Sequence, residues 1–247
     1  MDPGSLQRVL AAADISADDY ILEVGPGLGG LTRYLAAAAR HVAAVELDKR
    51  LIAPLKQVLS PYPNVRIIQG DILALDPAGL IESPGYLVVA NIPYYITSGL
   101  IRHLLEVRIK PSRIVLTLQR EVAQRICAGP GRLSLLALSV QVYGQPQMKG
   151  RIPAEAFYPV PKVESAVLRI DLFEQPVVRS EHLEMFFRLV RAGFSQRRKT
   201  LRNALAGGMA WQPAEAEAVL RAAEIAPNRR AQTLSLEEWA ELAAQIS

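Results

Sequence analysis

A glycine-rich turn and a set of acidic residues follow the apolar runs in the first half of the chain. The stretch "ILEVGPGLGG" gives Gly25, Gly27 and Gly30 the spacing G-x-G-x-x-G, after an apolar run and before a helix-like segment. Glycines at such a turn let the backbone fold tightly and let its N–H groups approach a ligand. Glu46 ends the next apolar run, where a carboxylate can bind two ribose hydroxyls. The pattern predicts a ligand that contains a nucleoside.

The acidic residues favour one nucleoside ligand over another. A dinucleotide would place its pyrophosphate at the helix N-terminus, and Glu23 would put a negative charge beside that anion. S-adenosyl-L-methionine has no phosphate, and its ammonium and sulfonium groups suit the same carboxylate. Asp71, at the end of the third apolar run in "QGDIL", is suited to accept from an adenine amino group. We predict a cofactor site for S-adenosyl-L-methionine built from Glu23, Gly25, Gly27, Glu46, Asp71 and Asn91. The alternative for Glu23 is a structural turn residue whose hydrogen bonds are satisfied within the protein.

The stretch "VVANIPYYITSG" ends a fourth apolar run on a polar residue, Asn91. The exocyclic amine of a nucleobase is a poor nucleophile, because its lone pair is delocalised into the ring. The Asn91 side-chain oxygen and the Ile92 carbonyl can accept the two amine hydrogens and hold the nitrogen toward a methyl donor. Pro93 restricts Ile92 to extended geometry, and Tyr94 can stack on an extruded base. These four residues form the predicted catalytic set, and an ordinary Asn-x-Pro turn is the alternative.

The sequence offers little for other chemistries. No side chain near these motifs is a candidate nucleophile or general base, as expected where positioning and desolvation drive methyl transfer. Three scattered histidines and the single Cys127 predict no metal site. No apolar stretch reaches the ~18 residues that a bilayer span requires, and the N-terminus lacks a signal-peptide pattern. We expect a cytoplasmic protein that does not bind membranes.

The spacing of apolar runs predicts the architecture. Residues 20–24, 41–46, 65–69, 86–90 and 113–119 are near-continuous apolar runs, typical of parallel strands covered by helices on both faces. Residues 29–40 and 119–128 read as helices, and residues 133–144 as either a helix or a strand. Residues 150–172 predict two strands joined by a proline-rich loop. The fold class is therefore α/β, a doubly wound, mostly parallel Rossmann-like sheet followed by a small all-helical domain, with domains at 1–174 and 175–247.

A one-signed charge cluster occupies the start of the helical region. Between Arg179 and Arg202 lie seven basic residues against two acidic ones, although the whole chain has a formal charge of only +4. A single helix over residues 183–205 would gather most of these cations on one arc, with Gly193 and Ser195 as points where it could break. Arginine-rich faces of one sign favour phosphate contact, and a merely solvated face is the alternative. We predict RNA binding by Lys162, Arg188, Arg191, Arg197, Arg198, Lys199 and Arg202. Phe157 and Tyr158 either flank the target base or belong to the core.

The motifs together resemble a known family. "EVGPGLGGLT", "VELD", "GDIL", "NIPYYIT", "FYPVPKVESAV" and "FSQRRKTLRNAL" are similar, in this order, to the small-subunit (16S) ribosomal RNA adenine N6,N6-dimethyltransferases, the Ksg/Dim group. The resemblance implies dimethylation of two adjacent adenosines in a hairpin near the 3′ end of small-subunit rRNA. It also implies S-adenosyl-L-methionine as cofactor and the immature small ribosomal subunit as partner. Gly25, Glu46, Asp71 and Asn91 match the family's cofactor-contacting positions, and we expect a monomer.

Three alternatives remain open. An Erm-like methyltransferase of large-subunit rRNA shares the Asn-x-Pro-aromatic signal, although "PVPKVESAV" and "QRRKTLRN" favour the small-subunit group. The family usually carries a Gln/Asn-x-Phe-Leu segment upstream of Asp2-Pro3-Gly4, and we expect this chain to lack it. A weakly active or non-catalytic assembly factor is therefore the second alternative. A nicotinamide-dependent oxidoreductase is the least favoured, because nothing supplies a hydride-transfer acid or base.

Overall fold

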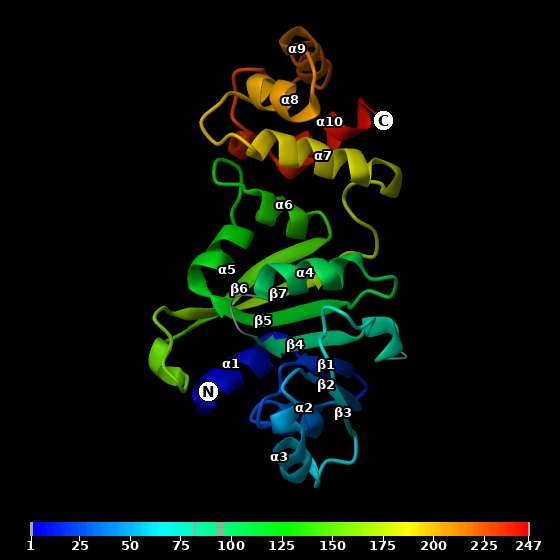
Figure 1. Ribbon diagram of the computed structural model, residues 1–247, viewed down its shortest axis with the longest axis vertical. Helices are drawn as coiled ribbons and strands as arrows, with labels where there is room; N and C mark the ends of the chain where they lie inside the picture. The colour runs from blue at the N-terminus through cyan, green and yellow to red at the C-terminus, as the bar shows by residue number, and fades with distance from the viewer. Residues whose placement is uncertain (1, 82, 93–95, 247) are drawn as a thin grey trace. The chain divides into compact units, whose positions relative to one another are not determined.

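A seven-stranded sheet forms the centre of the first compact unit (Figure 1). The computed structural model describes residues 2–81, 83–92 and 96–246. The strands are β1 (Tyr20–Val24), β2 (His41–Glu46), β3 (Val65–Gln69), β4 (Leu87–Asn91), β5 (Arg113–Gln119), β6 (Gly144–Ile152) and β7 (Ser165–Leu172). Their order is β3-β2-β1-β4-β5-β7-β6, with β1 to β5 parallel and β7 antiparallel to β5. The predicted doubly wound, mostly parallel fold class is confirmed.

Helices connect the strands and make up the end of the chain. They are α1 (Pro3–Ala13), α2 (Thr32–Ala38), α3 (Lys49–Leu59), α4 (Thr97–Glu106), α5 (Arg120–Ile126), α6 (Leu135–Gln141), α7 (Leu183–Phe194), α8 (Leu201–Met209), α9 (Pro213–Ala222) and α10 (Leu236–Ala244). The four parallel strands predicted at 20–24, 41–46, 65–69 and 113–119 are confirmed. The fourth strand is shifted by one residue, so that Asn91 is its last residue instead of the first residue after it.

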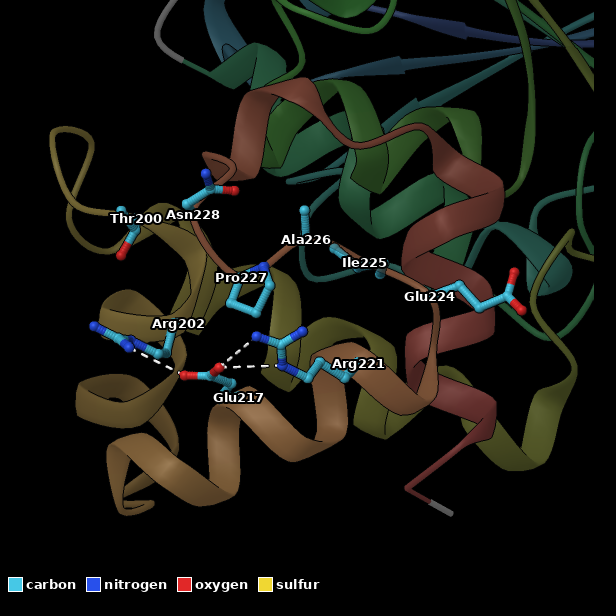
Figure 2. A pocket seen from close by; sticks show the side chains of 9 residues that line it. All are labelled: Thr200, Arg202, Glu217, Arg221, Glu224, Ile225, Ala226, Pro227 and Asn228. Atoms are coloured by element: carbon cyan, nitrogen blue, oxygen red, sulfur yellow. Dashed lines mark hydrogen bonds and ion pairs between the residues drawn. The ribbon is translucent and has the colours of Figure 1, made fainter.

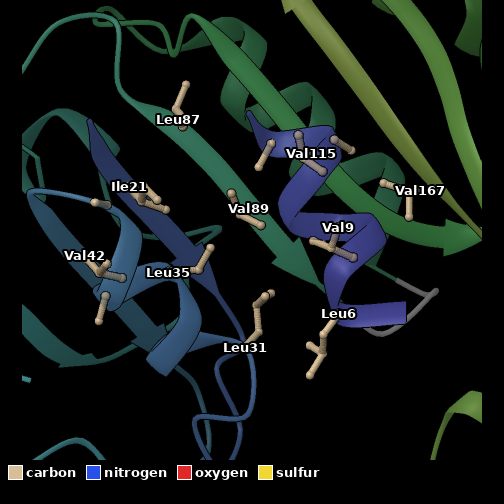
Figure 3. Packing of buried hydrophobic residues seen from close by; sticks show 14 of the residues in the cluster. Leu6, Val9, Ile21, Leu31, Leu35, Val42, Leu87, Val89, Val115 and Val167 are labelled. Carbon is tan, nitrogen blue, oxygen red and sulfur yellow. The ribbon is translucent and has the colours of Figure 1, made fainter. Parts of the chain in front are cut away.

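Both faces of the central strands are buried, which explains why these strands are apolar at consecutive positions. On one face, α1 and α2 pack Leu6, Val9 and Leu35 against Val89 and Val115 of the central strands (Figure 3). Alternate residues on the opposite face, such as Leu22, Val88 and Leu116, are fully buried too. Each such side chain contributes about 1.5–3 kcal/mol when removed from water, so the sheet holds its carboxyl edge rigidly.

Helix α1 is fixed at both ends. Asp2 caps its N-terminus by accepting from the Ser5 backbone N–H at 3.1 Å. At its C-terminus, Arg113 of β5 donates to the Ala13 carbonyl at 2.7 Å. Arg169 of β7 donates to another carbonyl of the last turn, and Asp171 pairs with both arginines. These contacts anchor the helix along β5 and β7.

The second compact unit is helical and takes in more of the chain than the sequence predicted. It comprises residues 124–145 and 173–247, and the first unit comprises residues 1–123 and 146–172. Residues 124–145 were predicted in the first domain, but α6 packs on α7 and the Tyr143 ring stacks on Phe187 with centroids 6.3 Å apart. Backbone bonds from Val177 and Phe173 to residues 142 and 143 join the same segment to the chain after β7. The open helix-or-strand choice for residues 133–144 resolves mainly as helix.

The single helix considered for residues 183–205 does not form. Helix α7 ends at Phe194, residues 195–200 form a turn, and α8 begins at Leu201. The helices on either side of the break pack closely on one another. A side chain at Gly193 would lie 2.5 Å from the buried Trp239 ring, and one at Gly208 would lie 2.5 Å from Ala192. The close approach of α7, α8 and α10 needs these glycines, and a continuous helix would separate the elements.

Candidate methyl-transfer site at the strand ends

The glycine turn lies directly beyond β1, next to the end of β4. Gly25 and Gly27 have φ values of 71° and 60°, which side chains rarely adopt. The Gly25 N–H donates to the Val45 carbonyl at 2.9 Å, and a methyl group added to Gly25 would lie 3.9 Å from the Asn91 carbonyl oxygen. The third left-handed glycine of the turn is Gly29 instead of Gly30, and a side chain at position 29 would also meet Leu55 of α3 at 3.1 Å. The turn therefore brings the first strand end against the fourth.

Glu46 supports this turn from β2. Its Oε2 accepts from the Gly27 N–H at 3.0 Å and its Oε1 accepts from the Asp48 N–H at 2.9 Å. The residue is only 7% exposed. Each carboxylate oxygen has about two acceptor positions, so each can take one further hydrogen bond. The carboxylate is thus oriented by the backbone and still able to bind a pair of hydroxyls.

Glu23 has different surroundings from Glu46. Its side chain is 1% exposed, and its Oε2 has no hydrogen-bond partner among the described residues. Burial raises the pKa of the Glu23 carboxyl to about 8, the Thr32 hydroxyl opposes this shift, and the Glu46 charge adds to it. The carboxyl is therefore mostly protonated at neutral pH unless a cation lies nearby, whereas the sequence reasoning treated it as a charge.

Asp71 follows β3 at the same edge of the sheet. Its Oδ1 accepts from the Leu73 N–H at 3.0 Å, and its carbonyl accepts from the Ala74 and Leu75 N–H groups. The side chain is exposed. A carboxylate held by this turn is available to a ligand that lies across the strand ends.

Asn91 ends β4 and is half-buried, and the following Ile92 is 4% exposed. In the register of the sheet, Asn91 pairs with Thr117 of β5. Pro93 and Tyr94, the other members of the predicted catalytic set, lie outside the described residues. The described half of the set therefore lies at the carboxyl edge, beside the glycine turn.

The loop between β6 and β7 reaches the same edge. Ser165 pairs with Gln119 in the antiparallel register, so residues 153–164 end where the parallel strands end. Arg120 holds this end of the loop through Glu164, with an Nη1–Oε2 distance of 2.7 Å. Phe157 packs against the core cluster, whereas Tyr158 is 98% exposed. Lys162 is exposed as well.

The predicted basic residues of the helical unit fall into two groups. Five of them, which we call the basic surface, are exposed and make no ion pair within the described part of the chain: Arg188, Arg191, Arg197, Arg198 and Lys199. Arg202 differs, because its guanidinium pairs with Glu217 at 3.1 Å, and Glu217 also pairs with Arg221 (Figure 2). These residues line a pocket of about 710 Å³ in the helical unit.

Across residues 2–81, 83–92 and 96–246, no cluster of three or more histidine, cysteine or acidic side chains is arranged to hold a metal ion. Within the same residues, no helix has both the length and the apolar character needed to cross a bilayer.

Comparison with known proteins identifies the family. A family model described as "Ribosomal RNA adenine dimethylase" matches residues 1–244. The chain belongs to the ribosomal RNA adenine dimethylase family. The resemblance that the motifs indicated is thereby confirmed, and this family consists of methyltransferases that use S-adenosyl-L-methionine.

Relatives of this dimethylase agree over nearly the whole chain. "Ribosomal RNA small subunit methyltransferase A" of Dehalococcoides mccartyi (strain CBDB1) is 45% identical over 99% of this chain and 84% of its own. The protein of the same name from Moorella thermoacetica is 41% identical over 100% of this chain and 89% of its own.

Two solved structures share the dimethylase fold. The 23S rRNA methyltransferase ErmE matches with a TM-score of 0.80 and 28% identity, over 99% of this chain and 98% of its own. A dimethyladenosine transferase from Plasmodium falciparum matches with a TM-score of 0.81 and 26% identity, over 98% and 94%.

Sequence reasoning missed two residues at the dimethylase strand ends. Gly29 carries the third positive φ, but its place inside "GLGG" gives no signal for choosing between it and Gly30. Thr117 is a fully buried polar residue beside Asn91. The available signal was a threonine inside the apolar run "RIVLTLQ". Its position beside Asn91 is known only from the register of β4 and β5.

Proposed function

We propose that this dimethylase transfers methyl groups to N6 of two adjacent adenosines in a hairpin near the 3′ end of small-subunit rRNA. Family membership and the small-subunit relatives at 41–45% identity support the substrate class. The observation that carries the site is the contact of two strand ends. The left-handed turn at Gly25 lies against the Asn91 carbonyl, so cofactor and acceptor groups share one edge.

The residues at this edge fit S-adenosyl-L-methionine. The Glu46 carboxylate, aligned by two backbone N–H groups, would bind the ribose hydroxyls. Asp71 would accept from the adenine amino group, and Gly25 and Gly27 leave room for the backbone to approach the ligand. When bound, the cofactor supplies a methyl group activated by its sulfonium. A cation near Glu23 would lower the pKa of that buried carboxyl and favour its ionised form.

Asn91 and Ile92 would hold the target amine. The carboxamide oxygen of Asn91 and the carbonyl of Ile92 would accept the two N6 hydrogens, which directs the nitrogen lone pair away from the strand end. Positioning of this kind lowers the barrier to methyl transfer, because the entropy loss of bringing the two reactants together has already occurred on binding. The proton released by methylation leaves to solvent after transfer. Pro93 and Tyr94 keep their predicted roles as proposals.

The basic surface would bind the rRNA backbone. Its five cations have no acidic neighbours within ion-pair distance in the described chain, so their charge is available to phosphates. Arg202 shares Glu217 with Arg221 and contributes less to phosphate attraction than the sequence reasoning assumed. Lys162, Phe157 and Tyr158 would meet RNA at the strand ends, where the exposed Tyr158 is the better candidate to flank the target base.

The biological setting follows from the substrate. We propose that the protein acts as a monomer in the cytoplasm, on immature small ribosomal subunits. Methylation during assembly suits a target hairpin that is reachable before the subunit is complete.

An Erm-like action on large-subunit rRNA is the second candidate, because ErmE shares the fold over 99% of this chain. The fold therefore does not discriminate between the two substrates, and the higher identity to small-subunit relatives favours the first.

Transfer of radiolabelled methyl groups from S-adenosyl-L-methionine to immature small subunits and to large-subunit rRNA tests the choice. We expect label in the small-subunit rRNA. Label in the large-subunit rRNA alone would replace the proposal with its alternative.

A further inference from the structure

Thr117 and Asn91 occupy neighbouring positions on the same face of the sheet. They are register partners on the parallel strands β5 and β4, and paired residues of neighbouring strands project to the same side. Val115 and Val89, two residues earlier on each strand, both point into the cluster covered by α1 (Figure 3). The threonine hydroxyl is therefore the neighbour of the Asn91 carboxamide at the carboxyl edge.

Within the described residues, the Thr117 hydroxyl makes no structural hydrogen bond. The residue is 1% exposed, and its Oγ1 has no hydrogen-bond partner among the described residues. A buried hydroxyl without a partner destabilises a folded chain, and valine would fill the same space without that cost. A residue that lowers stability beside a candidate catalytic group points to function.

The Asn91 carboxamide has an orientation problem that this hydroxyl can solve. The oxygen and the NH₂ group of an amide have nearly the same shape, so rotation by half a turn exchanges acceptor and donor. If the Asn91 NH₂ group faced the adenine amine, two hydrogen-bond donors would meet and neither would find an acceptor. Neighbouring strands lie about 4.8 Å apart, which brings the Thr117 hydroxyl within reach of the carboxamide after side-chain rotation.

We propose that Thr117 is a positioning residue for methyl transfer. In the substrate complex, its Oγ1 accepts a hydrogen bond from Nδ2 of Asn91, so that Oδ1 of Asn91 faces the adenine amino group. The inference rests on the proposed function, in which Asn91 accepts from that amine. It adds a residue that acts on the substrate only through Asn91.

Substitution of Thr117 by an isosteric apolar residue separates positioning from packing. We expect Thr117→Val to lower kcat for methyl transfer to small subunits about tenfold, with the Kd for S-adenosyl-L-methionine unchanged and the melting temperature unchanged or higher. Thr117→Ser keeps the hydroxyl and restores kcat. Thr117→Cys, a weaker acceptor of similar size, gives an intermediate kcat and serves if the valine variant folds poorly. Ser5→Ala removes another unpartnered buried hydroxyl, in α1, and leaves kcat unchanged.

The outcomes are distinguishable. An unchanged kcat in Thr117→Val overturns the positioning role, and so does an equal loss in the valine and serine variants, because that pattern reports packing alone. Failure of the unchanged protein to methylate small subunits contradicts the proposed function itself, and the inference with it.

Discussion

Glu23 and Glu46 lie near the ends of adjacent strands, yet their surroundings give them opposite properties. Glu46 accepts two backbone hydrogen bonds, which orient its carboxylate. Glu23 is enclosed and has a pKa raised to about 8, mainly by burial. The two carboxyl groups are therefore suited to different tasks, one binding hydroxyls and the other responding to a nearby cation.

Glu23 makes the stability of the cofactor-free protein depend on pH. Its folded pKa of about 8 lies above the ordinary value of 4.5, so the folded state binds more protons between these values. The contribution of Glu23 to the free energy of unfolding is therefore fully present below pH 4.5. It is lost as pH rises toward 8, by on the order of a few kcal/mol. Glu23→Gln removes the dependence, and chemical unfolding should find the variant increasingly more stable than the unchanged protein up to pH 8. A stability difference that is the same at pH 5 and pH 8.5 would contradict the raised pKa, and the exposed Glu184→Gln provides the control.

Glu46→Gln tests the ribose-binding role. Glutamine offers one acceptor oxygen, so it cannot accept from both the Gly27 and Asp48 N–H groups and also bind two hydroxyls. We expect the Kd for S-adenosyl-L-methionine to rise about 10- to 100-fold by calorimetry, since lost hydrogen bonds to a charged group cost about 1.5–3 kcal/mol. Glu184→Gln should keep the affinity of the unchanged protein. Equal affinity in Glu46→Gln would remove the residue from the cofactor site.

At the scale of elements, the strands were predictable and the helical connections were not. Four parallel strands coincide with their apolar runs, because burial on both faces leaves a continuous signal. The close packing of α7, α8 and α10 that accompanies the break depends on Gly193 fitting against Trp239 and Gly208 against Ala192. Both are contacts between residues from separate elements. The helix periodicity of residues 183–205 cannot predict them.

The break changes how the basic surface is built. Arg188 and Arg191 lie on α7, whereas Arg197, Arg198 and Lys199 lie in the turn that follows. Neutralising the three turn residues to glutamine should weaken rRNA binding and reduce the slope of log K against log salt by about 0.7–0.9 per lost phosphate contact. Arg40→Gln is the matched control, because this exposed arginine pairs with Asp18 after α2, away from the turn in sequence. An unchanged slope in the triple variant would move the RNA contact to other residues.

At the scale of the whole molecule, the sequence predicted the fold class and the family but not how the chain divides. The strand pattern and the motifs from Glu23 to Arg202 sufficed for the first two. Residues 124–145 join the helical unit through contacts with residues 173–187, which lie beyond two intervening strands. Such pairing is decided by packing between distant segments. The same holds for the proposed positioning role of Thr117, which depends on the register that sets this residue beside Asn91.

The net charge of +4 and the pI of about 9.3 suit a protein that meets a polyanion. The basic surface lies in the helical unit, and the acidic residues proposed to bind the cofactor lie in the sheet unit. We propose that this separation would let one unit attract rRNA while the other binds a cationic cofactor.

Mass-spectrometric mapping of small-subunit rRNA after incubation with the unchanged protein or Asn91→Ala, with cofactor affinity measured for both, tests whether Asn91 holds the target amine. We expect two adjacent N6,N6-dimethyladenosines near the 3′ end with the unchanged protein. Asn91→Ala should give a rate at least about 100-fold lower, with nearly the same Kd for S-adenosyl-L-methionine. Adjacent dimethyladenosines formed at the normal rate by Asn91→Ala would show that the amine is held by groups other than this carboxamide, and would contradict the account.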